Sequence, residues 1–139
     1  LTFLAICVSL IISIFSKYNN NINYLFLILG TISTSILFTY LGIIISTKCS
    51  SLNEYFIKVL PWMFIFTLPC LSIINKTYGK YFSFIPSVAG FRVIYGSFNS
   101  FSNIQLTILT LYGFLINILF FSKVVKIFKN SVFIGGSDD

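Results

Sequence analysis

The feature that most constrains the fold of this chain is an uncharged apolar run, Ile104 to Phe121, that is closed by three lysines. An apolar helix of roughly this length can cross the hydrocarbon core of a bilayer, which needs about 20 residues. Lys123, Lys126 and Lys129 follow the run, and basic residues beside a span collect on the cytoplasmic side. The sequence therefore predicts an integral membrane chain with a cytoplasmic C-terminus.

The composition points the same way. Hydrophobic residues make up 57% of the 139 residues and charged residues only 9%, with a mean hydropathy of +0.97. So few charged groups cannot cover the surface of a soluble domain of this length. The formal charge is +6, but the basic residues lie between the apolar runs. We interpret them as topology determinants and lipid-headgroup contacts, so we expect the lipid bilayer as a partner and no nucleic acid.

The chain divides into apolar segments separated by short polar breaks: residues 1–16, 24–46, 56–75, 81–98 and 104–122. We expect an all-α integral membrane fold in which about four of them are transmembrane helices. The transmembrane domain is predicted to cover 1–130, followed by a short polar cytoplasmic tail, 131–139. Because Leu1 already lies in an apolar run without a charged region before it, we expect the C-terminal part of a longer protein.

Ser51, Leu52, Asn53 and Glu54 match a capping box. In such a box the serine hydroxyl accepts from the amide of Glu54, and the Glu54 carboxylate reaches back to the amide of Ser51. A helix should therefore begin at Leu52. Its first turns are amphipathic, as in a short helix lying in the membrane interface, and Pro61 is expected to kink it before the span continues.

The segment 81–98 allows two readings. It contains Pro86, Gly90 and Arg92, and a full span with arginine near its middle costs about 2.5 kcal/mol or more on insertion scales. A re-entrant helical segment, which enters and leaves on the same side, avoids that cost where protein surrounds its turn.

The positive-inside rule favours the span. A span leaves two basic residues outside, and its inner side holds Lys17, Lys76, Lys80, Lys123, Lys126 and Lys129. Re-entry moves Lys48 and Lys58 inside, and its outer side holds Lys17, Lys76, Lys80 and Arg92. The residues alone leave both readings open.

Two lines of small and polar residues run along the predicted spans. One consists of Asn103, Thr107, Thr110, Gly113 and Asn117, and the other of Thr31, Ser35, Thr39, Gly42 and Ser46. Small residues let helix backbones approach closely, and hydroxyl or amide groups bond across the contact. Thr107, Thr110, Gly113 and Asn117 are therefore candidates for a helix interface, or alternatively for a polar pathway.

The sequence contains few side chains suited to catalysis. Glu54 is the only acid before the terminal Asp138 and Asp139, and there is no histidine. A carboxylate pair, a Ser-His or Cys-His nucleophile and a P-loop are all missing from the sequence. We expect no enzyme activity, no cofactor and no metal site, and we expect the three cysteines to be free thiols.

Residues 51–56, SLNEYF, and 85–98, IPSVAGFRVIYGSF, resemble the C-terminal part of ABC-2-type transporter permeases, especially the fluoroquinolone-export-like group. The resemblance covers roughly residues 24 to 130. It implies a six-helix permease with both termini cytoplasmic, of which this chain would hold the C-terminal part. It also implies that residues 81–98, with Pro86, Gly90 and Arg92, form a re-entrant element before the last helix.

The same resemblance implies a function. The chain would be a permease subunit in the bacterial plasma membrane that exports a drug, lipid or peptide-like substrate, as a dimer with separate ABC ATPase subunits. The residues expected to contact the ATPase are Lys48, Ser51, Asn53 and Glu54. Two other classes stay open: a small stand-alone bacterial membrane protein of the immunity or accessory type, and a fragment of a secondary transporter.

Overall fold

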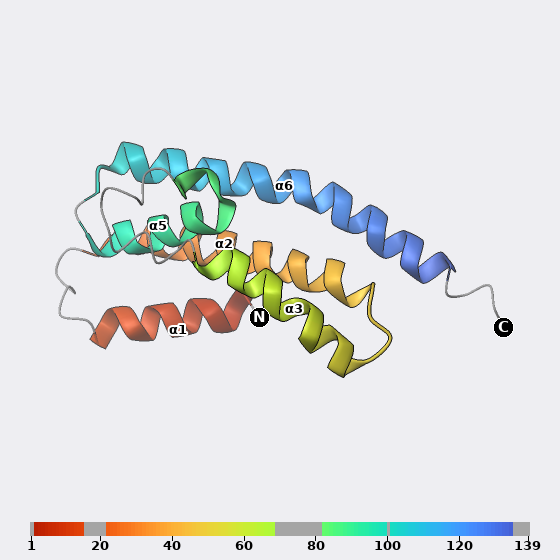
Figure 1. The fold of residues 1–139 in the computed structure, drawn as a ribbon. Helices are drawn as coiled ribbons and strands as arrows, with labels where there is room; N and C mark the ends of the chain where they lie inside the picture. The colour runs from red at the N-terminus through yellow and green to blue at the C-terminus, as the bar shows by residue number, and fades with distance from the viewer. Residues whose placement is uncertain (1, 16–21, 69–81, 100, 135–139) are drawn as a thin grey trace.

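The computed structural model describes residues 2–15, 22–68, 82–99 and 101–134, and most of these residues lie in helices (Figure 1). The elements are α1 (Thr2–Phe15), α2 (Tyr24–Ser46), α3 (Leu52–Thr67), the short 3-10 helix η3 (Phe82–Phe84), α5 (Pro86–Phe98) and α6 (Asn103–Ile134). The described residues contain no strand. The all-α class is therefore confirmed for this part of the chain.

Among the described residues, two helices are long and apolar enough to cross a bilayer. They are α2, with 23 residues, and the stretch Asn103–Ser131 of α6, with 29. The bounds of α2 agree with the prediction. The other two expected spans are described only in part, because α1 and α3 stop beside residues 16–21 and 69–81, which lie outside the described residues. Of the four expected spans, the described residues thus include two helices of spanning length.

α6 is longer than the apolar run that predicted it. It continues past Phe121 and through the lysines to Ile134, so residues 131–134 are helical although they were assigned to the tail. Lysine has a high helix propensity, and glycine, which commonly ends helices, first follows at Gly135. The helix therefore carries its three lysines on its own last turns.

α2, α5 and α6 pack together, each against the other two (Figure 1). The fully buried apolar side chains of the described chain come from these helices: Leu27, Val88, Ala89, Val93 and Leu106. Among the described helices, the extensive contacts of α1 are with α2, and those of α3 are with α2 and α5. The core is thus a three-helix unit.

α2 and α6 run in the same direction, from left to right in Figure 1. Asn117 of α6 bonds to Ser33 of α2, and the ring of Phe121 lies 6.3 Å from that of Tyr40. Later residues of α6 therefore contact later residues of α2, so the two helices are parallel.

α5 runs opposite to both. Its last turn meets the beginning of α2, where the Asn23 amide donates to the Ser97 carbonyl at 3.0 Å, while Phe91 packs against Phe38 farther along α2, at 6.3 Å between ring centroids. With 13 residues, α5 is only about 20 Å long at 1.5 Å per residue. That is shorter than the hydrocarbon core of a bilayer, about 30 Å.

α3 begins at Leu52, as the capping box predicted, and continues through Pro61 to Thr67 as one helix. None of its residues is buried. Its exposed large apolar side chains include Leu52, Phe56, Ile57, Leu60, Trp62, Met63, Phe64 and Ile65. An apolar surface of this extent marks contact with a membrane or with another protein.

Candidate functional site

The line of small and polar residues on α6 meets α2 at a buried polar contact. The Nδ2 of Asn117 donates to the backbone carbonyl of Ser33 at 2.9 Å and to its hydroxyl at 3.1 Å. A Cβ added at Gly113 would lie 2.6 Å from the Ser33 Oγ, so a side chain here would displace the hydroxyl that accepts from Asn117. Thr110 is buried on the same face and donates to the Leu106 carbonyl. Thr110, Gly113 and Asn117 are thus placed at a helix–helix contact.

Thr107 does not share this placement. It is exposed and donates to the Asn103 carbonyl within its own helix. The buried face of α6 begins instead at Leu106, which packs beneath Gly96 of α5. Thr107 is about 100° away from Leu106 around the helix, and this rotation directs it outward.

On α2, the residues that make the contacts were missed by sequence reasoning. Ser33 faces α6, and Thr34 faces α5, where a Cβ at Gly90 would collide with the Thr34 methyl group. The predicted line contributes the buried Thr31, whereas Ser35 and Thr39 border a smaller cavity between α1, α2 and α3. The missed signal is the spacing of three and four residues from Gly30 to Ser33 and Thr34, a pattern of small residues.

The segment predicted to be re-entrant supplies α5. Pro86 is the first residue of the helix, where its missing N–H costs nothing, and the next residue, Ser87, donates to the Phe66 carbonyl of α3 at 2.8 Å. Gly90 is buried against α2. The guanidinium carbon of Arg92 lies 5.7 Å from the centroid of the Phe101 ring, within the range of a cation–π interaction.

The loop between α2 and α3 contains the predicted cap. The Glu54 amide donates to the Ser51 hydroxyl at 3.3 Å, as expected. The return contact differs from the prediction, because the Glu54 carboxylate accepts from the amide and the hydroxyl of Ser50, at 2.8 and 2.9 Å. Ser50 offers two donors to one carboxylate oxygen, whereas Ser51 would offer only its amide.

Lys58 connects the start of this loop to the first turn of α3. Its ammonium donates to Glu54 at 2.6 Å and to the backbone carbonyl of Lys48 at 2.8 Å. The hydrogen bond from Lys58, followed by those from Ser50, lowers the pKa of Glu54 to about 2. Both carboxylate oxygens are therefore engaged within the loop. Among the candidate ATPase-contact residues, Lys48, Ser51 and Asn53 are exposed.

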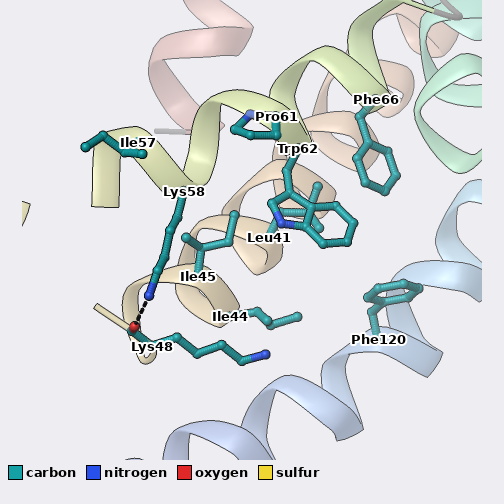
Figure 2. Close-up of a pocket in the computed structure, with 10 residues that line it drawn as sticks. All are labelled: Leu41, Ile44, Ile45, Lys48, Ile57, Lys58, Pro61, Trp62, Phe66 and Phe120. Atoms are coloured by element: carbon teal, nitrogen blue, oxygen red, sulfur yellow. Dashed lines mark hydrogen bonds between the residues drawn. The ribbon is translucent and has the colours of Figure 1, made fainter. Parts of the chain in front are cut away.

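A cavity of about 610 Å³ lies between α2, α3 and α6 beside this loop (Figure 2). Its lining is apolar except for two lysines: Leu41, Ile44, Ile45, Lys48, Ile57, Lys58, Pro61, Trp62, Phe66 and Phe120. The indole of Trp62 projects from α3 into the space between the three helices, toward Phe120. We call this space the lysine-edged groove.

No known protein family, curated protein or solved structure matches this chain. Among the described residues, no group of three or more histidine, cysteine, aspartate or glutamate side chains could hold a metal ion.

Proposed function

We propose that this chain is part of the transmembrane permease subunit of an ATP-driven ABC exporter, working as a dimer with separate ATPase subunits. The observation that carries the proposal is the parallel direction of α2 and α6, with the short α5 running against both. The motif resemblance in residues 51–56 and 85–98 supplies the family.

The directions of the helices support the re-entrant reading of residues 81–98. If α2, α3, a span at 81–98 and α6 crossed the bilayer in turn, alternate spans would be parallel, so α2 and α6 would be antiparallel. They are parallel instead, and α5 is antiparallel to α2, whereas an alternating span at 81–98 would be parallel to it. A segment that returns to the side from which it came accounts for both directions.

Re-entry also fixes the proposed orientation. The end of α2, the loop to α3 and the lysines of α6 then lie on the same side (Figure 1), and the positive-inside rule makes that side cytoplasmic. The exposed residues Lys48, Ser51 and Asn53 would face the ATPase there, whereas Glu54 would shape the loop. The permease would catalyse no reaction itself. It would alternate between two conformations, and the ATPase would shift the equilibrium between them.

The test is co-expression of the tagged chain with a P-loop ATPase encoded beside its gene. We expect the ATPase to co-purify and its ATP hydrolysis in vesicles to rise when the chain is present. Asn53→Lys, on the proposed contact loop, should reduce that stimulation. Gln105→Lys provides the matched control, because Gln105 is also exposed but lies in the first turn of α6, at the opposite end.

Failure of the ATPase both to co-purify and to respond would overturn the proposal. Equal loss of stimulation in the two lysine variants would instead reject the α2–α3 loop as the contact. Retention of full stimulation by Asn53→Lys would reject it as well.

A further inference from the structure

The lysine-edged groove carries an inference that does not depend on an ATPase. Its walls come from three helices, and its charged side chains are those of Lys48 and Lys58. An apolar space with a few polar groups at its edge is the usual form of a site for an amphiphilic ligand. The question is which of its cations is available to such a ligand.

Lys58 is already neutralised by the Glu54 carboxylate, 2.6 Å away. Lys48 contributes its backbone carbonyl to Lys58, but its ammonium has no hydrogen bond or ion pair with any described residue. Figure 2 shows the Lys48 side chain along the edge of the groove, with its ammonium directed away from Lys58. Within the part of the chain that the structure describes, Lys48 is therefore the groove cation without a paired acid.

We propose that the lysine-edged groove binds an anionic phospholipid of the surrounding bilayer. Its phosphate pairs with Lys48, and an acyl chain lies between α2, α3 and α6, against Ile44, Trp62 and Phe120. The apolar walls exclude water from the chain, and the long lysine side chain lets its ammonium remain at headgroup level. With the orientation proposed above, the lipid belongs to the cytoplasmic leaflet.

Charge favours this occupant over a second copy of the chain. Within the described residues, the end of the molecule that holds the groove carries Lys48, Lys58, Lys123, Lys126 and Lys129, and its one acid is Glu54. A second copy whose lysine-rich end entered the groove would add positive charge beside Lys48, and like charges repel, so the dimer proposed above would form through another face. An anionic headgroup relieves the same charge.

The fluorescence of Trp62 reports on the groove, because Trp62 is the only tryptophan of the sequence and lines the groove. The protein is reconstituted in phosphatidylcholine vesicles in which a minor fraction of the lipid carries brominated acyl chains. This brominated lipid, which quenches indole fluorescence, is phosphatidylglycerol in one preparation and phosphatidylcholine in the other. We expect about fivefold stronger apparent binding of the phosphatidylglycerol, the equivalent of about 1 kcal/mol for one lysine near the headgroups. Lys48→Gln should abolish the difference.

Lys123→Gln is the matched control, because Lys123 is exposed at the same end of the molecule but does not line the groove. It should keep the preference for phosphatidylglycerol. Equal quenching by the two brominated lipids in the wild-type protein would overturn the proposal, as would a preference that survives Lys48→Gln or is lost in Lys123→Gln. Absence of quenching by both brominated lipids would also overturn it and would indicate that protein, not lipid, fills the groove. All these results are independent of ATPase binding.

Discussion

Asn117 of α6 donates from one amide nitrogen to both the backbone carbonyl and the hydroxyl of Ser33 on α2. The two residues are separated by 84 positions in the sequence, and Asn117 is only 4% exposed. Its Oδ1 is buried without a hydrogen bond in the described part of the chain. This contact fixes the level at which the two candidate spans meet, and Gly113 one turn earlier lets their backbones approach.

We expect Asn117→Ala to lower the free energy of unfolding by about 1 to 2 kcal/mol, the upper range for interhelical hydrogen bonds in membrane proteins. Ser33→Ala should cost less, because the backbone carbonyl of residue 33 still accepts from Asn117. The measurement is an SDS titration of the protein in mixed micelles. Thr107→Ala, on an exposed residue of the same helix, should change the value by less than about 0.5 kcal/mol. A loss in Asn117→Ala no larger than in this control would contradict the account.

The packing of α5 on α2 gives a second prediction. Gly90→Ala should destabilise the fold by about 1 to 3 kcal/mol, because its Cβ would collide with Thr34 and force the helices apart. Gly42→Ala is the matched control, since its Cβ would meet only the Tyr55 hydroxyl, at 3.3 Å. Thermal unfolding in detergent micelles measures both. If Gly90→Ala is as stable as Gly42→Ala, α5 does not pack on α2 as described.

Local features of the sequence predicted local structure well. The bounds of α2 follow from an uncharged run with polar residues on both sides, and the first residue of α3 follows from the Ser51 cap. Both depend on interactions between residues that are close in sequence. The return contact of Glu54 was wrong by one residue, because Ser50 supplies its hydroxyl as well as its amide.

Contacts between helices were harder to predict. α2 packs against α1, α5 and α6, so small residues are required on more than one of its faces, and a single stripe identified Thr31 but missed Ser33 and Thr34. Whether residues 81–98 span was also open, because charge counting and the cost of Arg92 favoured different answers. The directions of α2, α5 and α6 are long-range properties that no short motif contains.

The loop between α2 and α3 gives a prediction on pH. The pKa of Glu54 is lowered from 4.5 to about 2 in the folded protein, so the unfolded chain binds this proton first as the pH falls. The contribution of Glu54 to stability is thus fully present above about pH 4.5 and is lost toward pH 2. Unfolding measured across this range should show a steeper loss for the wild-type protein than for Glu54→Gln. Parallel pH profiles for the two proteins would reject the hydrogen-bonded loop.

The parallel direction of α2 and α6 is the central claim, and the sidedness of Cys49 tests it most directly. Cys49 is in the loop after α2, so a variant with Cys7 and Cys70 replaced by serine carries one native thiol there. A second variant, lacking all three cysteines, carries Asn130→Cys near the end of α6. Both are labelled with a membrane-impermeant maleimide in intact cells and in inverted vesicles. We predict labelling of both thiols in inverted vesicles only; labelling of the two from opposite sides would contradict the account.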